Sequence, residues 1–195
     1  MTTEPPSAPV LLEAVTKQFG STPALKGLTT RIQAGRLTGL VGPDGAGKTT
    51  LIRLMAGLMA PTSGRISILG LDSRRDAADL AEVVGYMPQR FGLYEDLSVM
   101  ENLRLYASLR GLDARHREQA LDPLLTFTRL GPFTRRLAGK LSGGMKQKLG
   151  LACALLGSPK VLLLDEPSVG VDPVSRQDLW AMVAALTAKG LVVVW

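Results

Sequence analysis

The sequence predicts an α/β fold built on a mainly parallel sheet, preceded by a small antiparallel β subdomain and interrupted by a helical subdomain. Three observations lead to this prediction. A strand, a glycine-rich loop and a helix follow one another over residues 37–60, and strand, helix and strand recur over residues 161–195. Residues 96–157, between them, show helical periodicity alone. Strand–helix–strand order produces parallel strands that helices cover.

The first elements are predicted to be antiparallel. Residues 1–8 are rich in Pro, Ser and Thr, which predicts a disordered, frayed tail. From residue 10 to 40, short apolar runs alternate with turn residues, and turns are expected at 19–23 and 32–36. This pattern is typical of a small antiparallel sheet.

The parallel sheet is predicted to begin with a buried strand over 37–41. Apolar residues at helical spacing then predict a helix over 49–60, which ends before Pro61. Strands are expected over 65–69 and 83–87.

Three helices and two further strands complete the predicted chain. The helices of the insert are expected at 99–109, 114–130 and 145–156. A strand at 161–164, a helix at 172–189 and an apolar strand at 191–195 follow. A chain rarely ends inside a buried strand, so we expect the sheet to be C-terminally truncated and to continue beyond Trp195. The predicted units are an α/β core, which includes the antiparallel subdomain, over 9–88 and 157–195 and a helical subdomain over 89–156.

The composition is that of a globular domain. Of the 195 residues, 46% are hydrophobic and 21% are charged, so a core can form and extensive disorder is excluded. No apolar run approaches the ~20 residues that cross a bilayer, and the first residues do not form a signal peptide. The single cysteine, Cys153, cannot form an intrachain disulfide, which favours a reducing cytosol.

Positive charge is concentrated in one part of the chain. Residues 89–148 carry 11 Lys or Arg against 6 Asp or Glu, which is most of the net charge of +6. Such a region can face nucleic acid, an anionic membrane surface or an acidic partner, or it can be a solvated helical face. Aromatic residues do not interleave the basic ones as a base-stacking platform requires.

A phosphate-binding loop is predicted over residues 42–49, which match G-x-x-x-x-G-K-[ST] between a strand and a helix. Glycines let successive N–H groups converge on phosphate oxygens, and the helix start adds its positive dipole end. We expect Lys48 to reach the β- and γ-phosphates and the Thr49 hydroxyl to hold Mg²⁺. The nucleotide-binding candidates are Gly42, Pro43, Asp44, Gly45, Ala46, Gly47, Lys48, Thr49 and Thr50.

Two carboxylates follow the apolar strand at 161–164. The strand delivers Asp165 and Glu166 to the edge of the sheet where the phosphates lie. Asp165 is expected to hold Mg²⁺ through its water shell. Glu166 points elsewhere and is the candidate general base for an attacking water.

A second anion-binding helix start is predicted at 141–147. Ser142 is a helix-capping residue, and Gly143 and Gly144 expose backbone N–H groups. Basic residues near a helix start oppose the dipole unless an anion docks there. Since the chain already has one phosphate loop, this element is expected to serve a nucleotide held by another subunit; a plain glycine-rich helix start is the alternative.

These three motifs, in this order around a helical insert, resemble the nucleotide-binding domain of ABC transporters over residues 9–195. The stretches 87–99 and 139–147 are most similar to bacterial drug-efflux-type (ABC-2 type) ATP-binding subunits, in particular to the first half of tandem two-domain proteins. The resemblance implies an ATPase with a P-loop NTPase core. ATP and Mg²⁺ are the implied cofactors.

The resemblance also implies roles for single residues. Gln89 stands at the Q-loop position, where the family's glutamine senses Mg²⁺ and the attacking water. Phe19 stands where an aromatic residue stacks on adenine, although a core or turn aromatic is the alternative. Asp172 matches the D-loop and would lie near a partner subunit. Residues 94–100 would contact the membrane subunit.

Some positions depart from the family pattern. The switch histidine does not occur within this sequence; the single histidine, His116, is expected at the surface. Asp44 replaces the more usual Asn of the loop. Cys153 falls on the apolar face of its helix and is expected in the core.

The resulting hypothesis is a transport ATPase subunit that pairs head to tail with a second nucleotide-binding domain, either in a homodimer or in a tandem copy. It would power a membrane permease for drug or small-molecule efflux from the cytoplasm, at the inner face of the cell membrane, without a nucleic-acid partner. A soluble ABC-type ATPase acting on ribosomes or DNA is one alternative, but it would need long insertions. A regulatory module with little turnover is another, and the intact Glu166 argues against it. The fragment alone is expected to be poorly active.

Overall fold

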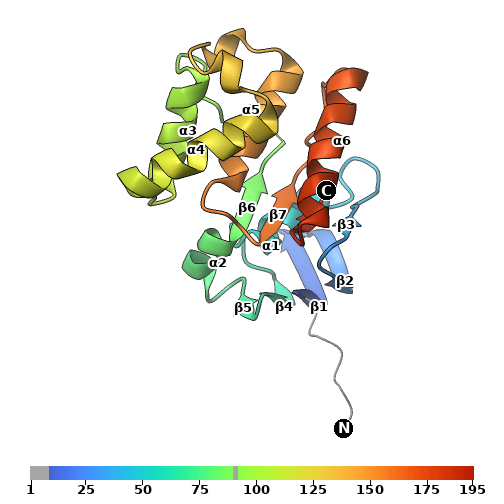
Figure 1. Cartoon of the computed structure of the whole chain (residues 1–195). Coiled ribbons are helices and arrows are strands. Elements are labelled where there is room, and N and C mark those ends of the chain that lie inside the picture. Colours follow the sequence, from blue (N-terminus) through green and yellow to red (C-terminus); the bar gives the residue numbers. More distant parts are fainter. Residues whose placement is uncertain (1–8, 90–91) are drawn as a thin grey trace.

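The computed structural model describes residues 9–89 and 92–195 and consists of a β-rich end, a central parallel sheet and a helical end (Figure 1). The tail predicted for residues 1–8 lies outside the described residues. The helical end comprises the segment that the sequence predicted to be an insert.

The antiparallel sheet has the strand order β2-β1-β4-β5. Strands β1 (Val10–Phe19) and β2 (Thr22–Ile32) form a hairpin, and β4 (Ser63–Ile68) pairs with the other edge of β1. A two-residue strand, β5 (Leu71–Asp72), extends the sheet. The predicted antiparallel sheet is confirmed, although β5 is too short to be recognised by alternation.

The parallel sheet has the strand order β3-β8-β7-β6. Its central strand, β7 (Val161–Leu164), is buried throughout and lies between β6 (Val84–Met87) and β8 (Val192–Val194). The side chains of β7 alternate between two hydrophobic cores, one against helix α1 and one against helices α5 and α6. Both faces are therefore covered, as expected of a parallel sheet.

The strand predicted over 37–41 is shorter and more exposed than expected. Strand β3 covers only Leu37–Thr38, and Val41 is 98% exposed. β3 is the last strand in the sheet order and is hydrogen-bonded to β8 alone, where Thr38 is level with Val194. Two further backbone bonds extend this pairing, from the N–H of Trp195 to the carbonyl of Thr38 at 2.9 Å and from the N–H of Leu40 to the carbonyl of Trp195 at 2.6 Å. After Leu40 the chain turns away into the glycine-rich loop.

Helix α1 (Lys48–Met55) is also shorter than predicted. It ends at Ala56 because Gly57 adopts a left-handed conformation with φ +70°, so the apolar Leu58 lies outside the helix. Helix α2 (Ala77–Val83) was not predicted, since it has a single buried residue, Leu80, and hence no apolar periodicity.

The helical end contains α3 (Val99–Leu109), α4 (Ala114–Thr128) and α5 (Gly143–Leu155), joined by two short 3-10 turns, Gly131–Phe133 and Ala138–Lys140. These helices enclose a separate hydrophobic core. Helix α6 (Pro173–Ala188) runs beside α5 and covers the parallel sheet (Figure 1). The helices expected in this region are present, with ends that differ by about two residues.

Two residues of the helical end lie where they were expected. The His116 side chain is 68% exposed and contacts Asp113 at 2.7 Å. Cys153 is 2% exposed, and burial raises the pKa of its thiol. Among the helices of the described residues, none is both long and apolar enough to cross a membrane.

The burial of Cys153 predicts that its thiol reacts slowly with a thiol reagent in the native protein. We expect Ellman's reagent to modify the native protein at least about tenfold more slowly than the guanidinium-unfolded protein, because a buried thiol is neither accessible nor ionised. Ser108→Cys, at an exposed position of α3, provides a fast-reacting control. Equal rates for native and unfolded protein would show that α5 is not docked as described.

Candidate active site

The loop between β3 and α1 is shaped by its glycines. Gly45 and Gly47 have φ values of +78° and +91°, which L side chains rarely adopt. A Cβ atom on Gly47 would also lie 2.6 Å from the carbonyl oxygen of Ala24. Gly47 precedes α1, whose first turn has neither a side-chain cap nor an acidic residue. The N–H groups at this helix start are therefore available to an anion.

Lys48 is folded back over its own loop. Its Nζ donates hydrogen bonds to the carbonyl oxygens of Gly42 at 2.8 Å and Pro43 at 3.0 Å, and lies 3.5 Å from Oε1 of Glu166. The ammonium group thus lies beside the N–H-lined loop, where phosphate oxygens can replace its present partners.

Thr49 and Asp165 meet at the centre of the site. The Thr49 hydroxyl donates a hydrogen bond of 2.8 Å to Oδ1 of Asp165, which is fully buried at the end of β7. The other oxygen, Oδ2, is buried without a hydrogen-bond partner among the described residues. A buried carboxylate oxygen that lacks a partner, next to a hydroxyl, is the donor set of a magnesium ion, so these residues fit that metal.

Glu166 is held between two groups. Its Oε2 accepts a 2.9 Å hydrogen bond from Nε2 of Gln89, and its Oε1 faces Lys48. The backbone of Glu166 has φ +50°, a conformation uncommon for a residue other than glycine. Glu166 and Asp165 have different partners, since Asp165 is bonded to Thr49 while Glu166 contacts Gln89 and Lys48.

These groups surround one open pocket of about 650 Å³. The loop from Asp44 to Thr50, Gln89 and Glu166 line it, and Phe19 closes one side with a 48% exposed ring. The ammonium of Lys17 lies 5.3 Å from the centre of that ring, a contact that the sequence analysis did not identify. An exposed aromatic ring beside a phosphate loop offers a stacking surface for a base.

The glycine-rich start of α5 lies apart from this pocket. Ser142 caps α5, with its Oγ accepting from the N–H of Met145 at 3.3 Å, and Gly144 fits closely against α6, where an added Cβ would lie 2.3 Å from Cβ of Ser175. Asp172 caps α6 by accepting from the N–H of Ser175, and this hydrogen bond lowers the Asp172 pKa. Ser142, Gly143, Gly144 and Asp172 do not line the pocket around Lys48. Their assignment to a nucleotide stays a prediction.

Two neighbours of the site were not foreseen. Trp195 lines a small space of about 160 Å³ together with Lys48, Asp165 and Glu166, and its ring stacks on Trp180 of α6 at 4.5 Å. Ser175 sets the packing of α5 on α6. Both contacts join residues that are distant in sequence, so local patterns carry no signal of them.

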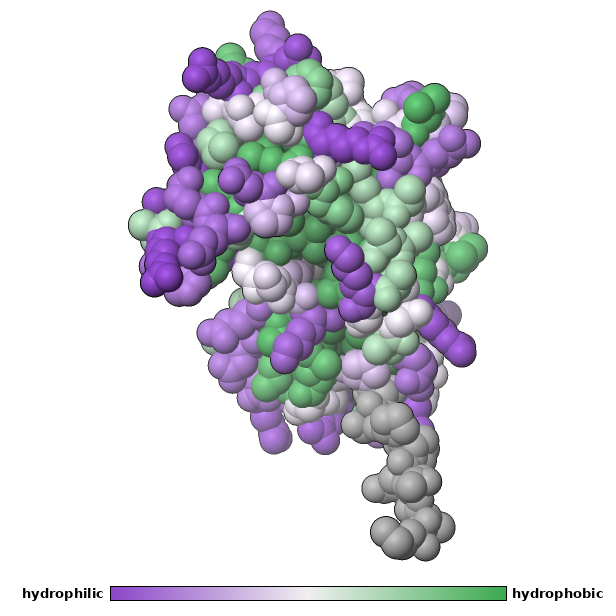
Figure 2. Space-filling model, viewed as in Figure 1, coloured by the Kyte–Doolittle hydropathy of each residue, from purple (hydrophilic) through white to green (hydrophobic). Residues whose placement is uncertain are grey.

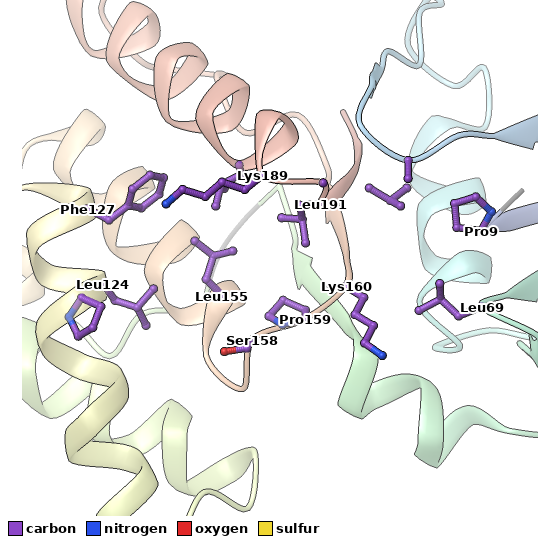
Figure 3. Close-up of a pocket in the computed structure, with 15 residues that line it drawn as sticks. Pro9, Leu69, Leu124, Phe127, Leu155, Ser158, Pro159, Lys160, Lys189 and Leu191 are labelled. Carbon is purple, nitrogen blue, oxygen red and sulfur yellow. The ribbon is translucent and has the colours of Figure 1, made fainter.

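A second hollow, of about 570 Å³, lies at the start of β7 and β8, between the helical and β-rich ends (Figure 3). Leu124, Phe127, Leu155 and Leu191 make it mainly apolar, and hydrophobic residues gather on this face of the surface (Figure 2). It contains two lysines, Lys160 and Lys189, but no glycine-rich loop at a helix start, so it does not fit a polyphosphate.

Comparison with known proteins agrees with this geometry. Residues 25–169 match the ABC transporter family, and solved structures of that family superpose on the chain. The chain belongs to the ABC transporter family. It is an ATP-binding domain of that family, with the α/β fold expected of one. A structure described as the ATP-binding subunit of an ABC transporter is 32% identical, with a TM-score of 0.81 over 95% of this chain and 77% of that chain.

Curated relatives of this ABC domain are named as ATP-binding proteins of transport or export systems. A probable multidrug ABC transporter ATP-binding protein, YbhF of Escherichia coli K12, is 58% identical over 96% of the chain and 33% of its own length. A Nod factor export ATP-binding protein of Burkholderia lata is 40% identical over 95% of the chain and 61% of its own length. The chain thus spans about a third of the first relative and three-fifths of the second.

The loop geometry predicts different costs for two glycine substitutions. Gly45→Ala forces φ +78° on an alanine in open space, which should cost about 1–2 kcal/mol of stability. Gly47→Ala adds a clash with the Ala24 carbonyl and should cost more. Urea unfolding of both variants measures the difference. Equal unfolding free energies would contradict the close approach of the loop to β2.

Lys48→Ala should weaken ATP·Mg²⁺ binding roughly tenfold to a hundredfold, because charge-assisted contacts contribute ~1.5–3 kcal/mol each. Isothermal calorimetry measures the affinity. Lys189→Ala removes the same charge from the second hollow and serves as the matched control. If the Lys48→Ala protein binds as tightly as the parent, the phosphate-loop assignment is wrong.

Proposed function

We propose that this domain hydrolyses ATP in a head-to-tail pair with a second nucleotide-binding domain and so powers a membrane permease that exports a drug or another small molecule. One observation carries the proposal. Lys48, Thr49, Glu166 and Gln89 line one pocket, and Asp165 is hydrogen-bonded to Thr49 beside it, whereas Ser142 starts a helix outside it. One chain thus offers one half of each of two sites.

ATP binding would use groups that are now hydrogen-bonded to one another or to the loop backbone. The free N–H groups at the start of α1 and the Lys48 ammonium would hold the β- and γ-phosphates, and the ring of Phe19 would stack on the base. Lys48 would exchange the carbonyl oxygens of Gly42 and Pro43 for phosphate oxygens. Thr49 and Oδ2 of Asp165 would hold Mg²⁺, which neutralises phosphate charge when it is bound.

Hydrolysis would use Glu166 as the base. As the water oxygen forms a bond to the γ-phosphorus, the bond from that phosphorus to the β–γ bridging oxygen breaks, and ADP and phosphate leave. The water proton passes to the Glu166 carboxylate. Gln89 keeps that carboxylate in place through its 2.9 Å hydrogen bond to Oε2, which leaves Oε1 free once Lys48 has turned to the phosphates.

The start of α5 would close the site of the partner domain. Its first turn has no acidic residue, and Gly143, next to Ser142, is exposed and has no side chain. A γ-phosphate of the opposite domain would satisfy these groups and the helix dipole. A relative of this fold, 27% identical with a TM-score of 0.82, is described as a dimeric post-hydrolysis ATP-binding cassette with ADP and Pi, which supports such a pair.

The permease would meet the domain at the junction of the core and the helical end. A groove of about 490 Å³ there is lined by Tyr86 and by Leu58 and Leu109, which are 64% and 69% exposed. Tyr94, in the segment expected to face the permease, is 54% exposed. An amphipathic permease segment fits such a surface. This contact would place the domain in the cytoplasm at the inner face of the membrane.

Several basic residues of the helical end already have acidic partners, which supports a protein partner rather than nucleic acid. Lys146 lies 2.8 Å from Glu95, Lys148 lies 2.7 Å from Asp178, and Arg104 and Glu118 form a two-point contact at 3.1 Å.

The proposed substrate class rests on the relatives, which include a daunorubicin resistance ATP-binding protein of Streptomyces coeruleorubidus, 38% identical.

Blocking the base should trap the closed pair. In the full-length ATP-binding protein, Glu166→Gln keeps the side-chain shape but removes the proton acceptor, so radiolabelled ATP should remain bound through gel filtration. Adding Ser142→Arg should abolish this retention, because it places bulk and charge at the shared phosphate. Equilibrium ATP binding to the phosphate loop should survive.

Gln119→Arg, which adds the same charge at an exposed position of α4, should leave retention intact. Failure of the Glu166→Gln protein to retain ATP, or retention that survives Ser142→Arg, would refute the shared-nucleotide mechanism.

A further inference from the structure

We infer that Asn102 is a positioning residue for Ser142. Asn102 fixes the shape of residues 94–98, which we call the 94–98 segment. This segment in turn holds the part of the chain that leads into α5. The inference rests on the proposed function, since Ser142 matters only if it closes on a nucleotide. It concerns a buried amide remote from both the phosphate loop and Glu166.

Asn102 is a fully buried polar residue on α3, and it is the sole asparagine of the sequence. Its Oδ1 accepts from the N–H of Tyr94 at 2.9 Å. Its Nδ2 donates to the carbonyl oxygens of Tyr94, Leu97 and Ser98 at 3.0–3.1 Å. An amide is needed because the site presents one donor and three acceptors. Burial makes loss of these bonds costly.

The 94–98 segment is also hydrogen-bonded along its other edge, to residues 134–139, which we call the 134–139 segment. The carbonyl oxygens of Glu95 and Leu97 accept from the N–H groups of Gly139 at 3.0 Å and Ala138 at 2.8 Å. Ser98 and Leu137 form an antiparallel bridge. Just after the 94–98 segment, the N–H groups of Val99 and Met100 donate to the carbonyl oxygens of Arg136 and Thr134, both at 3.0 Å.

The 134–139 segment leads to Ser142 without a loose loop. Its last residues enter the 3-10 turn Ala138–Lys140, and the N–H of Leu141 donates to the carbonyl of Ala138. Ser142 then caps α5. A second connection runs through side chains, because Lys146, in the first turns of α5, contacts Glu95 at 2.8 Å. The position of Ser142 therefore depends on the 94–98 segment at two points.

The inner edge of the 94–98 segment depends on Asn102. Tyr106, one turn further along α3, adds a hydrogen bond of 2.7 Å to the carbonyl of Gly92, just before the segment. The segment also follows Gln89, which holds Glu166, while the Tyr94 side chain lies half exposed on the outside. A push on Tyr94 from outside would thus move the segment and the start of α5 together, with Asn102 keeping the segment rigid enough to transmit it.

Asn102→Asp tests this role with little change in size. The second carboxylate oxygen replaces the donor amide and faces three carbonyl oxygens. In the full-length Glu166→Gln protein, we expect this change to reduce ATP retention tenfold or more. Equilibrium ATP affinity should change less than threefold, because the phosphate loop is not touched. Hydrogen exchange should accelerate in both segments and at residues 140–142, while β7 stays protected.

Arg104→Gln is the matched control, since Arg104 lies on the same helix and its partner, Glu118, is on the exposed side. It should change neither retention nor exchange. Glu95→Gln, a surface substitution that leaves the fold intact, weakens the second connection and should reduce retention two- to threefold. It keeps the inference testable if Asn102→Asp does not fold.

The outcomes separate the inference from the proposed function. If the Glu166→Gln parent retains no ATP, the proposed function is wrong. If the parent retains ATP and both the Asn102→Asp and Glu95→Gln proteins retain as much, Asn102 does not position Ser142. The inference is also overturned if exchange accelerates in the 94–98 segment while residues 134–142 stay as protected as in the parent.

Discussion

The hydrogen bond between Thr49 and Asp165 joins two elements that are 116 residues apart in sequence. It fixes the first turn of α1 against the end of β7, and the rest of the site is arranged around it. Lys48 precedes Thr49 and Glu166 follows Asp165, so their 3.5 Å contact is a consequence of that one bond. Asp165 is fully buried, and its Oδ2 has no hydrogen-bond partner among the described residues. Because a buried carboxylate oxygen needs a donor or a cation, this arrangement supports the proposed magnesium site.

The two ends of the molecule contribute different halves of the proposed chemistry. The parallel sheet and α1 present the phosphate loop, the buried carboxylate and the base. The helical end has its own hydrophobic core and presents the start of α5. The two are joined where Gly144 fits against Ser175 and where Lys148 lies 2.7 Å from Asp178, whose pKa that hydrogen bond lowers. These contacts hold the start of α5, where Ser142 is exposed and does not line the chain's own Lys48 pocket.

Hydrogen bonds to the backbone, together with the hydrophobic core of the helical end, shape the path from residue 94 to α5. A buried ladder of N–H and carbonyl pairs keeps its register or loses bonds that are costly to leave unmade. The pairs between the 94–98 and 134–139 segments and the four hydrogen bonds of Asn102 form such a network. We therefore expect this part of the helical end to move as one body between the proposed permease contact and the proposed shared nucleotide.

The sequence by itself determined the fold class, the phosphate loop, the carboxylate pair and the glycine-rich helix start. These features depend on contiguous residues, whose periodicity and backbone needs are visible along the chain. The tertiary structure decided the rest. The 37–41 strand shortened to two residues because its pairing depends on β8, and α1 ended early at a left-handed glycine. The bond from Gln89 to Glu166, the bond from Thr49 to Asp165 and the backbone pairing of the 94–98 segment with the 134–139 segment appear only when distant segments meet. A local sequence pattern depends only on neighbouring residues and therefore predicts helices, strands and loops. A buried polar contact between segments depends on which partner the folded chain places next to it, so the sequence alone does not predict it.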